Sequence, residues 1–339
     1  MARIGDGGRA VGRPGGKLAA RRRFDALAIG DAILDVVNDP VPARGSGDGQ
    51  SRVDSITYLP GGNATNFALA LARLGGRAAF VGSVGRDAGA RVLRDAYRAA
   101  GVAARLRTTA GPTGTTMAVT YEGGRRHLIT ALGANGNLRP SDAPPRWIAS
   151  ASHVHRAGYW WTPRLQGPPT LRLLRSAHAR GATTSLDIAT DPEGWTPSRR
   201  DSVRTVLPEV DVFFGNEEET LRTGARPDVE ASAEVLLDLG VREVVVHLGP
   251  RGSLAVTRER SFRSAPFRAK ARNPTGCGDV FNAAYVLASL HGADVASRLR
   301  IANAAGAWHL EHPDAPYPSR RDLARRFGPR AGRILSSTR

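Results

Sequence analysis

Short apolar runs alternate along the chain with segments whose apolar residues recur at helical spacing. Residues 24–30 (FDALAIG) form an apolar run that ends in glycine, which predicts a buried strand. Residues 63–74 repeat apolar side chains on one helical face and stop at Gly75-Gly76, which predicts a helix. The same patterns predict strands at 78–81, 153–157, 184–187, 210–214 and 243–247, and helices at 88–100, 165–179, 231–239, 278–290 and 295–309. This alternation favours a doubly wound α/β fold, a mainly parallel sheet with helices on both faces.

Two stretches, 36–60 and 106–130, depart from this alternation. Both show polar and apolar residues in turn, punctuated by glycine and proline. A period of two predicts antiparallel strands that lie outside the main sheet. We therefore predict a small β lid over a site at the carboxyl ends of the parallel strands. The unpaired edges of such a sheet favour a homodimer formed through the lid.

Length and charge limit the organisation of the chain. Its 339 residues, 41% of them hydrophobic, are enough for one large α/β domain, to which we assign residues 24–328. The formal charge of +17 is concentrated at the ends, because residues 1–23 and 319–339 each carry seven basic residues and one acidic residue. Low apolar content with net charge predicts a disordered basic arm at 1–23 and a disordered basic tail at 329–339. No zinc finger or basic–aromatic pattern accompanies this charge, so we expect no specific nucleic-acid partner.

Cysteine usage and apolar run lengths exclude further classes. The single cysteine, Cys277, excludes an internal disulfide, and no Cys/His cluster indicates a structural zinc site. The longest apolar runs, such as 67–72, are far shorter than the roughly 20 residues that a membrane-spanning helix needs. The N-terminal residues are polar and lack the apolar core of a signal peptide. We therefore expect a cytoplasmic protein with no membrane partner.

The segment 273–282, NPTGCGDVFN, carries the strongest chemical signal. Asn-Pro ends the preceding strand, two glycines allow a tight turn, and an amphipathic helix follows. The backbone N–H groups of Gly276, Cys277 and Gly278 then form an anion site for a phosphoryl group at a helix N-terminus. Asp279, in the first turn, is placed to accept a proton from an attacking hydroxyl. The structural alternative is that Asp279 only stabilises the helix dipole.

This segment resembles the second signature of the ribokinase (PfkB) family, usually Asp-Thr-Thr-Gly-Ala-Gly-Asp. Residues 61–75, GGNATNFALALARLG, resemble the family's first signature. Further pieces follow in the family's order: GDAILD (30–35), GSVGRDAG (82–89), TGT (113–115), GAN (133–135), NEEE (216–219), LGPRG (248–252) and ANAAG (302–306). The resemblance covers about residues 24–320 and implies a ribokinase-like fold and an ATP-dependent kinase that acts on a small molecule.

On the catalytic and nucleotide side, the resemblance implies roles residue by residue. Asp279 matches the family's catalytic base, and Gly276 to Gly278 match its anion hole. ATP and Mg²⁺ are the implied cofactors, and Mg²⁺ prefers oxygen ligands with retained waters. The residues matched to ATP binding are Asn216, Glu219, Leu248, Gly249, Gly252 and Asn303, the first two also serving Mg²⁺. The alternatives are a solvated helix acid for Glu219 and a surface amide for Asn303.

On the acceptor side, the residues that the resemblance implies are Asp35, Gly61, Gly62, Asn66 and Asn135. An aspartate after the first strand and an asparagine that opens a helix suit the binding of neighbouring hydroxyls. An exposed loop acid is the alternative for Asp35, and Asp31 is a weaker candidate for this role. The aromatic residues at 159–161 either stack on the substrate or pack against a helix.

The chain departs from the family's pattern at several positions. Asn273 replaces an aspartate that often helps to bind an activating monovalent cation, and 308–318 lack a glycine usual in the cation loop. Both changes weaken the case for a monovalent cation as cofactor. Asn63 stands where ribose-binding members carry lysine, which disfavours ribose as the substrate. Cys277 replaces the commoner alanine, and its backbone N–H, not its thiol, is expected to act.

We therefore predict an ATP-dependent phosphotransferase that acts on a hydroxyl of a sugar or sugar acid. A nucleoside kinase of the same family is the main alternative, and a non-catalytic binding protein on this fold is a third. No G-x-G-x-x-G motif follows the first strand, which argues against a dinucleotide-binding dehydrogenase. Gly16-Lys17 lacks the upstream glycine and the preceding strand of a P-loop.

Overall fold

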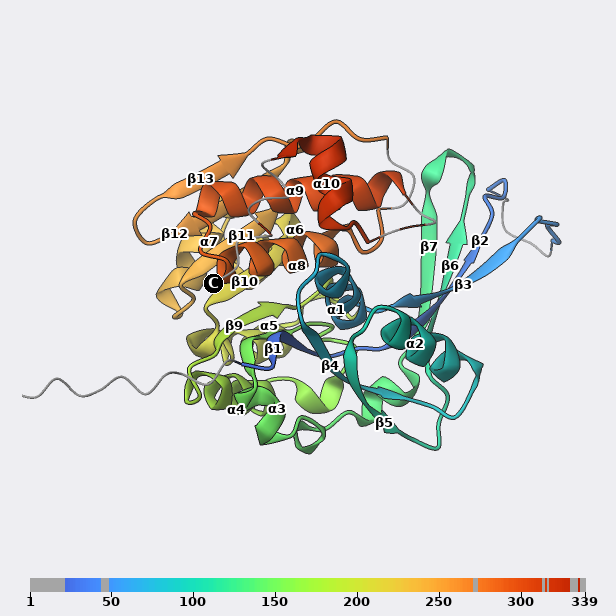
Figure 1. Cartoon of the computed structure of the whole chain (residues 1–339), viewed down its shortest axis with the longest axis horizontal. Coiled ribbons are helices and arrows are strands. Elements are labelled where there is room, and N and C mark those ends of the chain that lie inside the picture. The colour runs from blue at the N-terminus through green and yellow to red at the C-terminus, as the bar shows by residue number, and fades with distance from the viewer. Residues whose placement is uncertain are drawn as a thin grey trace, which may run out of the picture.

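A large twisted sheet between two layers of helices forms the body of the protein, and a smaller sheet projects from one end (Figure 1). The computed structural model describes residues 22–43, 49–270, 274–312, 315, 317–329 and 335. In these ranges the large sheet has the strand order β13 (Ser261–Ser264), β12 (Ser253–Thr257), β11 (Glu243–His247), β10 (Val212–Asn216), β9 (Thr183–Asp187), β8 (Ala151–Arg156), β1 (Phe24–Ile29), β4 (Ala78–Val84) and β5 (Ala103–Thr108). Strands β11 to β5 in this order are parallel, and β12 and β13 are antiparallel.

The helices cover both faces of the large sheet, as a doubly wound fold requires. One face packs against α1 (Asn63–Arg73), α2 (Ala88–Ala99), α8 (Cys277–Leu290), α9 (Val295–Glu311) and α10 (Arg320–Phe327). The other face packs against α3 (Pro145–Ala149), α4 (Pro168–His178), α5 (Pro197–Arg204), α6 (Glu217–Gly224) and α7 (Val229–Asp238). The predicted fold class is therefore confirmed.

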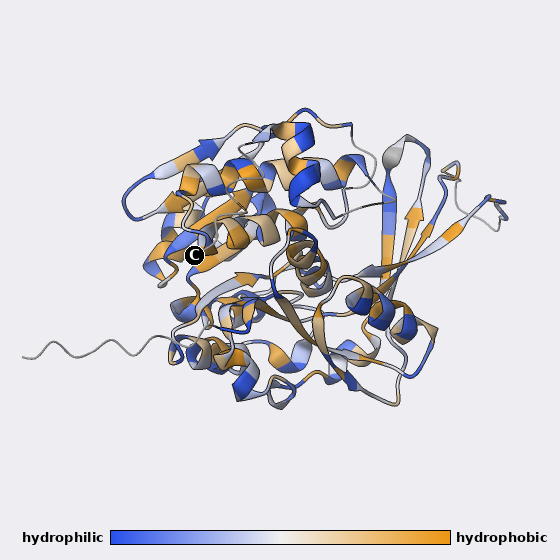
Figure 2. Cartoon of the chain, in the orientation of Figure 1, coloured by the Kyte–Doolittle hydropathy of each residue, from blue (hydrophilic) through white to orange (hydrophobic). Residues whose placement is uncertain are grey.

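Strand β1 shows why the parallel strands read as continuous apolar runs. Ala26 and Ala28 are buried in the core on the α1 side, and Leu27 and Ile29 are buried in the core on the α4 side. Because both faces of the sheet are covered, successive side chains are all removed from water. Figure 2 shows the resulting apolar interior, with hydrophilic colour gathered on the outer surfaces of the helices.

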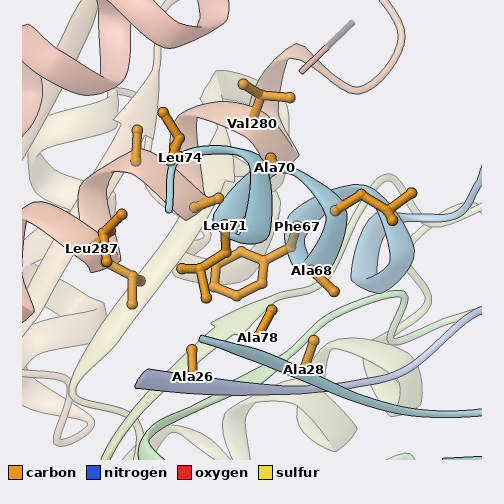
Figure 3. Packing of buried hydrophobic residues seen from close by; sticks show 14 of the residues in the cluster. Ala26, Ala28, Phe67, Ala68, Ala70, Leu71, Leu74, Ala78, Val280 and Leu287 are labelled. Carbon is orange, nitrogen blue, oxygen red and sulfur yellow. The ribbon is translucent and has the colours of Figure 1, made fainter. Parts of the chain in front are cut away.

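Helix α1 lies close to the sheet because the strands beneath it carry small side chains. Phe67 and Leu71 on α1 point toward Ala26, Ala28 and Ala78 on β1 and β4 (Figure 3). Both α1 side chains are completely buried. Figure 3 also shows α8 packed along the other side of α1. This packing brings the N-termini of α1 and α8, where both family-like signatures begin, to the same end of the sheet.

The smaller sheet is the predicted lid. It contains β3 (Ile56–Gly61), β2 (Ile33–Asn38), β6 (Gly114–Thr120) and β7 (Arg126–Ala131), in that order across the sheet. Its two segments come from separate parts of the chain, as the alternation of polar and apolar residues predicted. The face toward the body carries polar and apolar residues, and the outer face exposes large apolar side chains.

Two details of the lid prediction were wrong. Residues 106–108, assigned to the lid, end β5, which pairs with β4 as an edge strand of the main sheet. An edge strand that is half solvated alternates in the same way as a lid strand, so the pattern did not separate them. The lid is also not wholly antiparallel, because β2 and β6 pair in parallel. These strands belong to two distant segments and are not joined by a hairpin.

The chain ends differ from their prediction where they are described. Most of the predicted arm (1–23) and tail (329–339) lies outside the described residues. Within it, Arg22 donates from Nη2 to the carbonyl of Arg180 at 2.6 Å. Leu335, in the predicted tail, is completely buried in the core on the α1 side. The sequence pattern gave no signal for this contact, because a single leucine has no periodicity. Among the described helices, none has the length and apolar character that crossing a membrane requires.

Candidate active site

A cavity of about 230 Å³ lies between the lid and the N-termini of α1 and α8. Its polar lining includes Asp31, Asp35, Asn63, Asn66, Thr116, Arg126, Thr130, Thr275, Asp279, His309 and Tyr317. Its apolar lining includes Ile33, Val37, Leu59, Pro60, Ala118, Leu128 and Trp161. The backbone of Gly62 and Gly276 completes the wall. The fold therefore brings five predicted site residues into one cavity, namely Asp35, Gly62, Asn66, Gly276 and Asp279.

Asp279 is the carboxylate that the fold controls most tightly. It stands in the first turn of α8 and is only 4% exposed. Its Oδ1 accepts a hydrogen bond from Asn63 Nδ2 at 3.1 Å, and its Oδ2 accepts one from Asn66 Nδ2 at 2.9 Å. Both donors stand in the first turn of α1, so the packing of α1 on α8 holds the carboxylate from two sides.

The electrostatics around Asp279 favour its protonated form in the absence of substrates. Burial raises the pKa of Asp279 well above its ordinary value, and the nearby carboxylates of Asp187 and Asp31 raise it further. The hydrogen bonds from Asn66 and Asn63 lower this pKa and oppose those effects. A carboxylate with an elevated pKa is a stronger base once ionised, which suits proton abstraction from a hydroxyl.

The anion site was predicted at the N-terminus of α8. Gly276 is its N-cap and has a φ of 86°, a left-handed conformation that favours glycine. A Cβ at Gly276 would also lie 3.2 Å from both Asn66 Nδ2 and His309 Nε2. The first N–H groups of a helix have no intrahelical acceptor. Here the N–H of Cys277 donates to the carbonyl of Pro274, just before the helix, at 3.3 Å. His309 Nε2 donates to the carbonyl of Thr275 at 2.6 Å and so braces the loop from α9.

On the acceptor side, Asp35 on β2 faces the cavity from the lid. Burial raises the pKa of Asp35 to about 7, Asp31 raises it further and Arg126 opposes the change. Gly61 lies directly beneath this side chain, since a Cβ there would overlap the Asp35 carboxylate. Asp31 has a different task, because its carboxylate accepts the backbone N–H groups of Asn63 and Ala64 at 3.1 and 3.0 Å. It therefore caps the N-terminus of α1.

Asn135 is placed differently from its predicted substrate contact. It lies in the short helix Gly133–Asn137, is fully buried and is not part of the cavity lining. Its Oδ1 accepts the N–H of Ala32 and its Nδ2 donates to the carbonyl of Ala32, both at 2.9 Å. Since both amide groups bind the turn between β1 and β2, Asn135 fixes the turn that presents Asp31 and Asp35.

The two tryptophans have separate roles. Trp160 is 3% exposed, donates from Nε1 to the carbonyl of Ala189 and packs edge-on against Trp195. Trp161 lines the cavity. From the sequence, each tryptophan could either stack on the substrate or pack against a helix. Neighbouring residues after a strand point in different directions, and the sequence does not show which of the two faces the cavity.

A second cavity, of about 870 Å³, lies between α6, the loop that follows it and the end of β11. Its lining includes the predicted nucleotide residues Asn216, Leu248 and Gly249, together with His247. His247 also lies against α8, because a Cβ on Gly278 would be 3.2 Å from its Cε1 atom. His247 is therefore the residue through which the lining of this cavity reaches the first turn of α8.

Asn216 and Glu219 form a capping box at the start of α6. The Oδ1 atom of Asn216 accepts the N–H of Glu219, and Glu219 accepts the N–H of Asn216, both at 2.8 Å. Glu219 is 5% exposed, and burial together with Asp187 raises its pKa to about 8. Burial likewise raises the pKa of Asp187 to about 6. Glu219 is thus a buried carboxylate, and not the solvated helix acid that was the alternative, but it lines neither of the two cavities.

Gly252 and Asn303 meet at the loop after β13. Gly252 has a φ of 88°, and a Cβ there would overlap the carbonyl of Ser264. Asn303 Nδ2 donates to the carbonyls of Ser264 and Ala265 at 3.2 and 3.1 Å. Both residues therefore shape one loop. Asn303 is more than a surface amide, and the need for glycine at 252 comes from the protein's own backbone.

The site contains several residues that the sequence did not assign to it. Asn63 holds the base, where the family resemblance marked it only as a departure from ribose-binding members. Tyr317 and Arg126 line the acceptor cavity. His247, through Nε2, donates to Asn282, which donates in turn to the buried Asp187. These six residues lie on six separate elements or loops, so no local motif links them.

No group of three or more His, Cys, Asp and Glu side chains in the described ranges is arranged to hold a metal. Asn216 and Glu219 offer oxygen donors of the kind that Mg²⁺ prefers. Their oxygens already serve the capping box, so they fit a hydrated Mg²⁺ carried by ATP phosphates better than a resident ion. Asn273, the departure at the monovalent cation site, lies outside the described residues.

Comparison with known proteins agrees with this architecture. The pfkB family carbohydrate kinase model matches residues 24–321. The ATP-dependent ribose-1-phosphate kinase of Halopiger xanaduensis is 30% identical over 267 residues, which cover 77% of this chain and 83% of that protein. The 5-dehydro-2-deoxygluconokinase of Photobacterium profundum is 23% identical over 299 residues, 84% of this chain and 88% of the relative.

The fold has equally clear neighbours among solved structures. An Escherichia coli protein assigned as ribokinase II, solved with ATP and Mg²⁺, superposes with a TM-score of 0.78 at 22% identity. The match covers 89% of this chain and 98% of that one. Since the family model spans the whole body of the chain, including both signatures and the lid, the protein belongs to the pfkB family of carbohydrate kinases.

Proposed function

We propose that this kinase transfers the γ-phosphoryl group of ATP to a hydroxyl of a sugar or sugar acid, with Asp279 as the general base. One observation carries the proposal. The buried Asp279 carboxylate lines the smaller cavity and stands in the first turn of α8, where Gly278 lies against His247, a residue that lines the larger cavity. A proton acceptor and an anion site thus lie next to each other on one helix.

The proposed reaction follows from this arrangement. The acceptor hydroxyl gives its proton to Asp279 as its oxygen forms a bond to the γ-phosphorus of ATP. The bond from that phosphorus to the β–γ bridging oxygen breaks, and ADP leaves with the bonding electrons. N–H groups at Gly276, Cys277 and Gly278 stabilise charge on the transferring phosphoryl group. When bound, Mg²⁺ would be supported by Asn216 and Glu219 and would neutralise phosphate charge.

The acceptor cavity supports a polyhydroxylated substrate. Asp35 and Asn66 present polar groups that suit neighbouring hydroxyls, and about 230 Å³ is room for one small sugar. Arg126 on β7 brings a positive charge near Asp35 and Cys277, which suits the carboxylate of a sugar acid. The relatives named above act, by their names, on a ribose phosphate and on a deoxy sugar acid, both of which are anionic.

A nucleoside kinase is the second candidate function. The observation that favours it is Trp161, which lines the same cavity as the apolar lid residues Leu59, Ala118 and Leu128. A flat nucleobase stacks well on an aromatic ring beside aliphatic side chains. A sugar or sugar acid offers these apolar side chains less apolar surface to contact than a nucleobase does.

ATP turnover with a panel of acceptors tests the proposal. The panel contains neutral sugars, sugar acids, sugar phosphates and nucleosides, and ADP formation is measured above the rate without acceptor. We expect strong stimulation by a sugar or sugar acid and weak stimulation by nucleosides. Stimulation by nucleosides alone would transfer the assignment to the second candidate. A protein that binds acceptors without any ATP turnover would support the non-catalytic alternative.

We also propose that two copies pair through the outer face of the lid. Register aligns Val36, Tyr58, Met117 and Ile129 in one row across all four strands. The last three are exposed by 59%, 52% and 53%. A continuous apolar row on a thin sheet is expected to be covered by an equivalent row. Light scattering of the wild-type protein should give twice the monomer mass, and the Met117→Asp variant should give the monomer mass. A monomer mass for the wild-type protein at working concentration contradicts the proposal.

The remaining proposals concern the chain as a whole. We propose that residues 24–328 form the kinase domain with the terminal segments outside it, apart from the buried Leu335. A cytoplasmic location fits an ATP-consuming enzyme whose single cysteine, Cys277, forms no disulfide. Expression of the full chain with fractionation of the cells checks this location.

A further inference from the structure

Tyr317 and Arg320, which follow α9 in the chain, contact the two ends of α1. Arg320, the first residue of α10, donates from Nε to the carbonyl of Leu74 at 2.6 Å, at the C-terminus of α1. Tyr317, three residues earlier, donates from its hydroxyl to Asn66 Oδ1 at 2.8 Å, in the first turn of α1. The segment is thereby fixed along the helix that holds the base.

The contact with Tyr317 decides which way the Asn66 amide faces. Because the tyrosine hydroxyl donates to Oδ1, the Nδ2 group is left facing Asp279, where it donates to Oδ2 at 2.9 Å. In this orientation the amide offers protons and favours an ionised carboxylate. A flipped amide would present its oxygen to Asp279 and favour the protonated acid, which cannot accept the proton of a substrate.

We propose that Tyr317 is a positioning residue that fixes the Asn66 amide and so keeps Asp279 in its proton-accepting form. The inference rests on the proposed function of Asp279 as the base. Tyr317 does this without touching Asp279 through a direct hydrogen bond, since its hydroxyl is directed to Asn66. The base is thus controlled by a residue far beyond the second signature.

The other groups around the base explain why this control matters. Burial and neighbouring carboxylates both disfavour the ionised Asp279, so the amide donors are the groups that oppose them. The titratable and charged groups that face Asp279 or share its cavity are Asp31 after β1, Asp35 on β2, Arg126 on β7, Asp187 on β9, Cys277 on α8, His309 on α9 and Tyr317 itself. All but the last remain unchanged when the tyrosine hydroxyl is removed.

Tyr317→Phe in the full chain tests the inference, with Tyr121→Phe, which follows β6 and lines neither cavity, as the matched control. Loss of one oriented hydrogen bond should lower kcat about 3- to 10-fold at pH 7. The acid limb of the kcat profile should move up by about 0.5 to 1 pH unit, so activity recovers at high pH. KM for ATP should not change. An equal loss at every pH, or a rise in acceptor KM alone, would overturn the inference.

A double-variant cycle separates the role of Asn66. If Tyr317 acts through the amide, adding Tyr317→Phe to Asn66→Ala should change kcat less than twofold, and fully multiplicative effects would refute this. The same cycle is read without any acceptor, from the pH dependence of Tm between pH 5 and 8. Absence of coupling there also refutes the inference, whereas absence of turnover in the wild-type chain alone counts against the proposed function.

Discussion

Replacing Asp279 by asparagine is the most direct perturbation of the proposed chemistry. Asparagine keeps the size of the side chain but cannot accept the proton of the acceptor hydroxyl. General-base catalysis contributes typically ~10²- to 10⁴-fold to a rate, or about 2.7 to 5.4 kcal/mol of activation free energy. We expect Asp279→Asn to lower kcat by at least 100-fold, because no other group accepts hydrogen bonds from both Asn63 and Asn66 in this position.

The structure also gives the effect on folding. The new amide accepts from one of the two asparagines and turns its own NH₂ toward the other, so one buried donor loses its partner at a cost of about 1–3 kcal/mol. Against this, the variant removes a charge whose folded-state pKa is raised. Such a carboxylate destabilises the fold progressively as pH rises from its unfolded pKa toward its folded pKa. The Tm of Asp279→Asn relative to wild type should therefore increase as the pH rises above the ordinary aspartate pKa of 3.8.

The assay compares ADP formation with the best acceptor, ATP affinity by calorimetry, and Tm. Asp294→Asn is the control, since Asp294 caps α9 by accepting the N–H of Ser297 at 2.7 Å, lines neither cavity, and asparagine caps equally well. ATP affinity should change little, because in the proposed mechanism backbone groups at 276–278, and not the Asp279 side chain, bind the phosphate. Retention of more than about a tenth of the wild-type turnover would refute Asp279 as the base.

Further predictions concern backbone, core and thiol. Gly252→Ala should lower the free energy of unfolding by more than about 2 kcal/mol, because the φ of 88° and the nearby Ser264 carbonyl exclude a side chain. Gly249→Ala should cost about half as much, because a side chain there would enter open space. Urea unfolding of both variants checks this difference. Leu335→Ala should cost about 2–5 kcal/mol despite its place in the predicted tail, and an unchanged Tm would contradict its burial. Burial raises the pKa of Cys277 to about 12, so iodoacetamide at pH 8 should label the thiol slowly, and rapid labelling would contradict its burial. Cys277→Ala should stay active.

The sequence by itself determined the features that depend on neighbouring residues. Apolar runs and helical periodicity placed the strands and helices, because each period reflects which faces of an element are buried. The order of Gly276, Gly278 and Asp279 in one turn predicted an anion site beside a carboxylate, since a helix start fixes those positions locally. The lid was predicted for the same reason, from the period of two.

Tertiary structure decided what distant segments share. Asn63 and Asn66 reach Asp279 across 216 and 213 positions of sequence, and Tyr317 reaches Asn66 across 251. Asn135 matched a substrate-binding position of the family, yet its amide is hydrogen-bonded to the backbone of Ala32. Hydrogen-bond partners of this kind depend on how α1, α8 and the turn after β1 pack, which no local pattern specifies. The chemistry of the base is therefore local in sequence, and its control is tertiary.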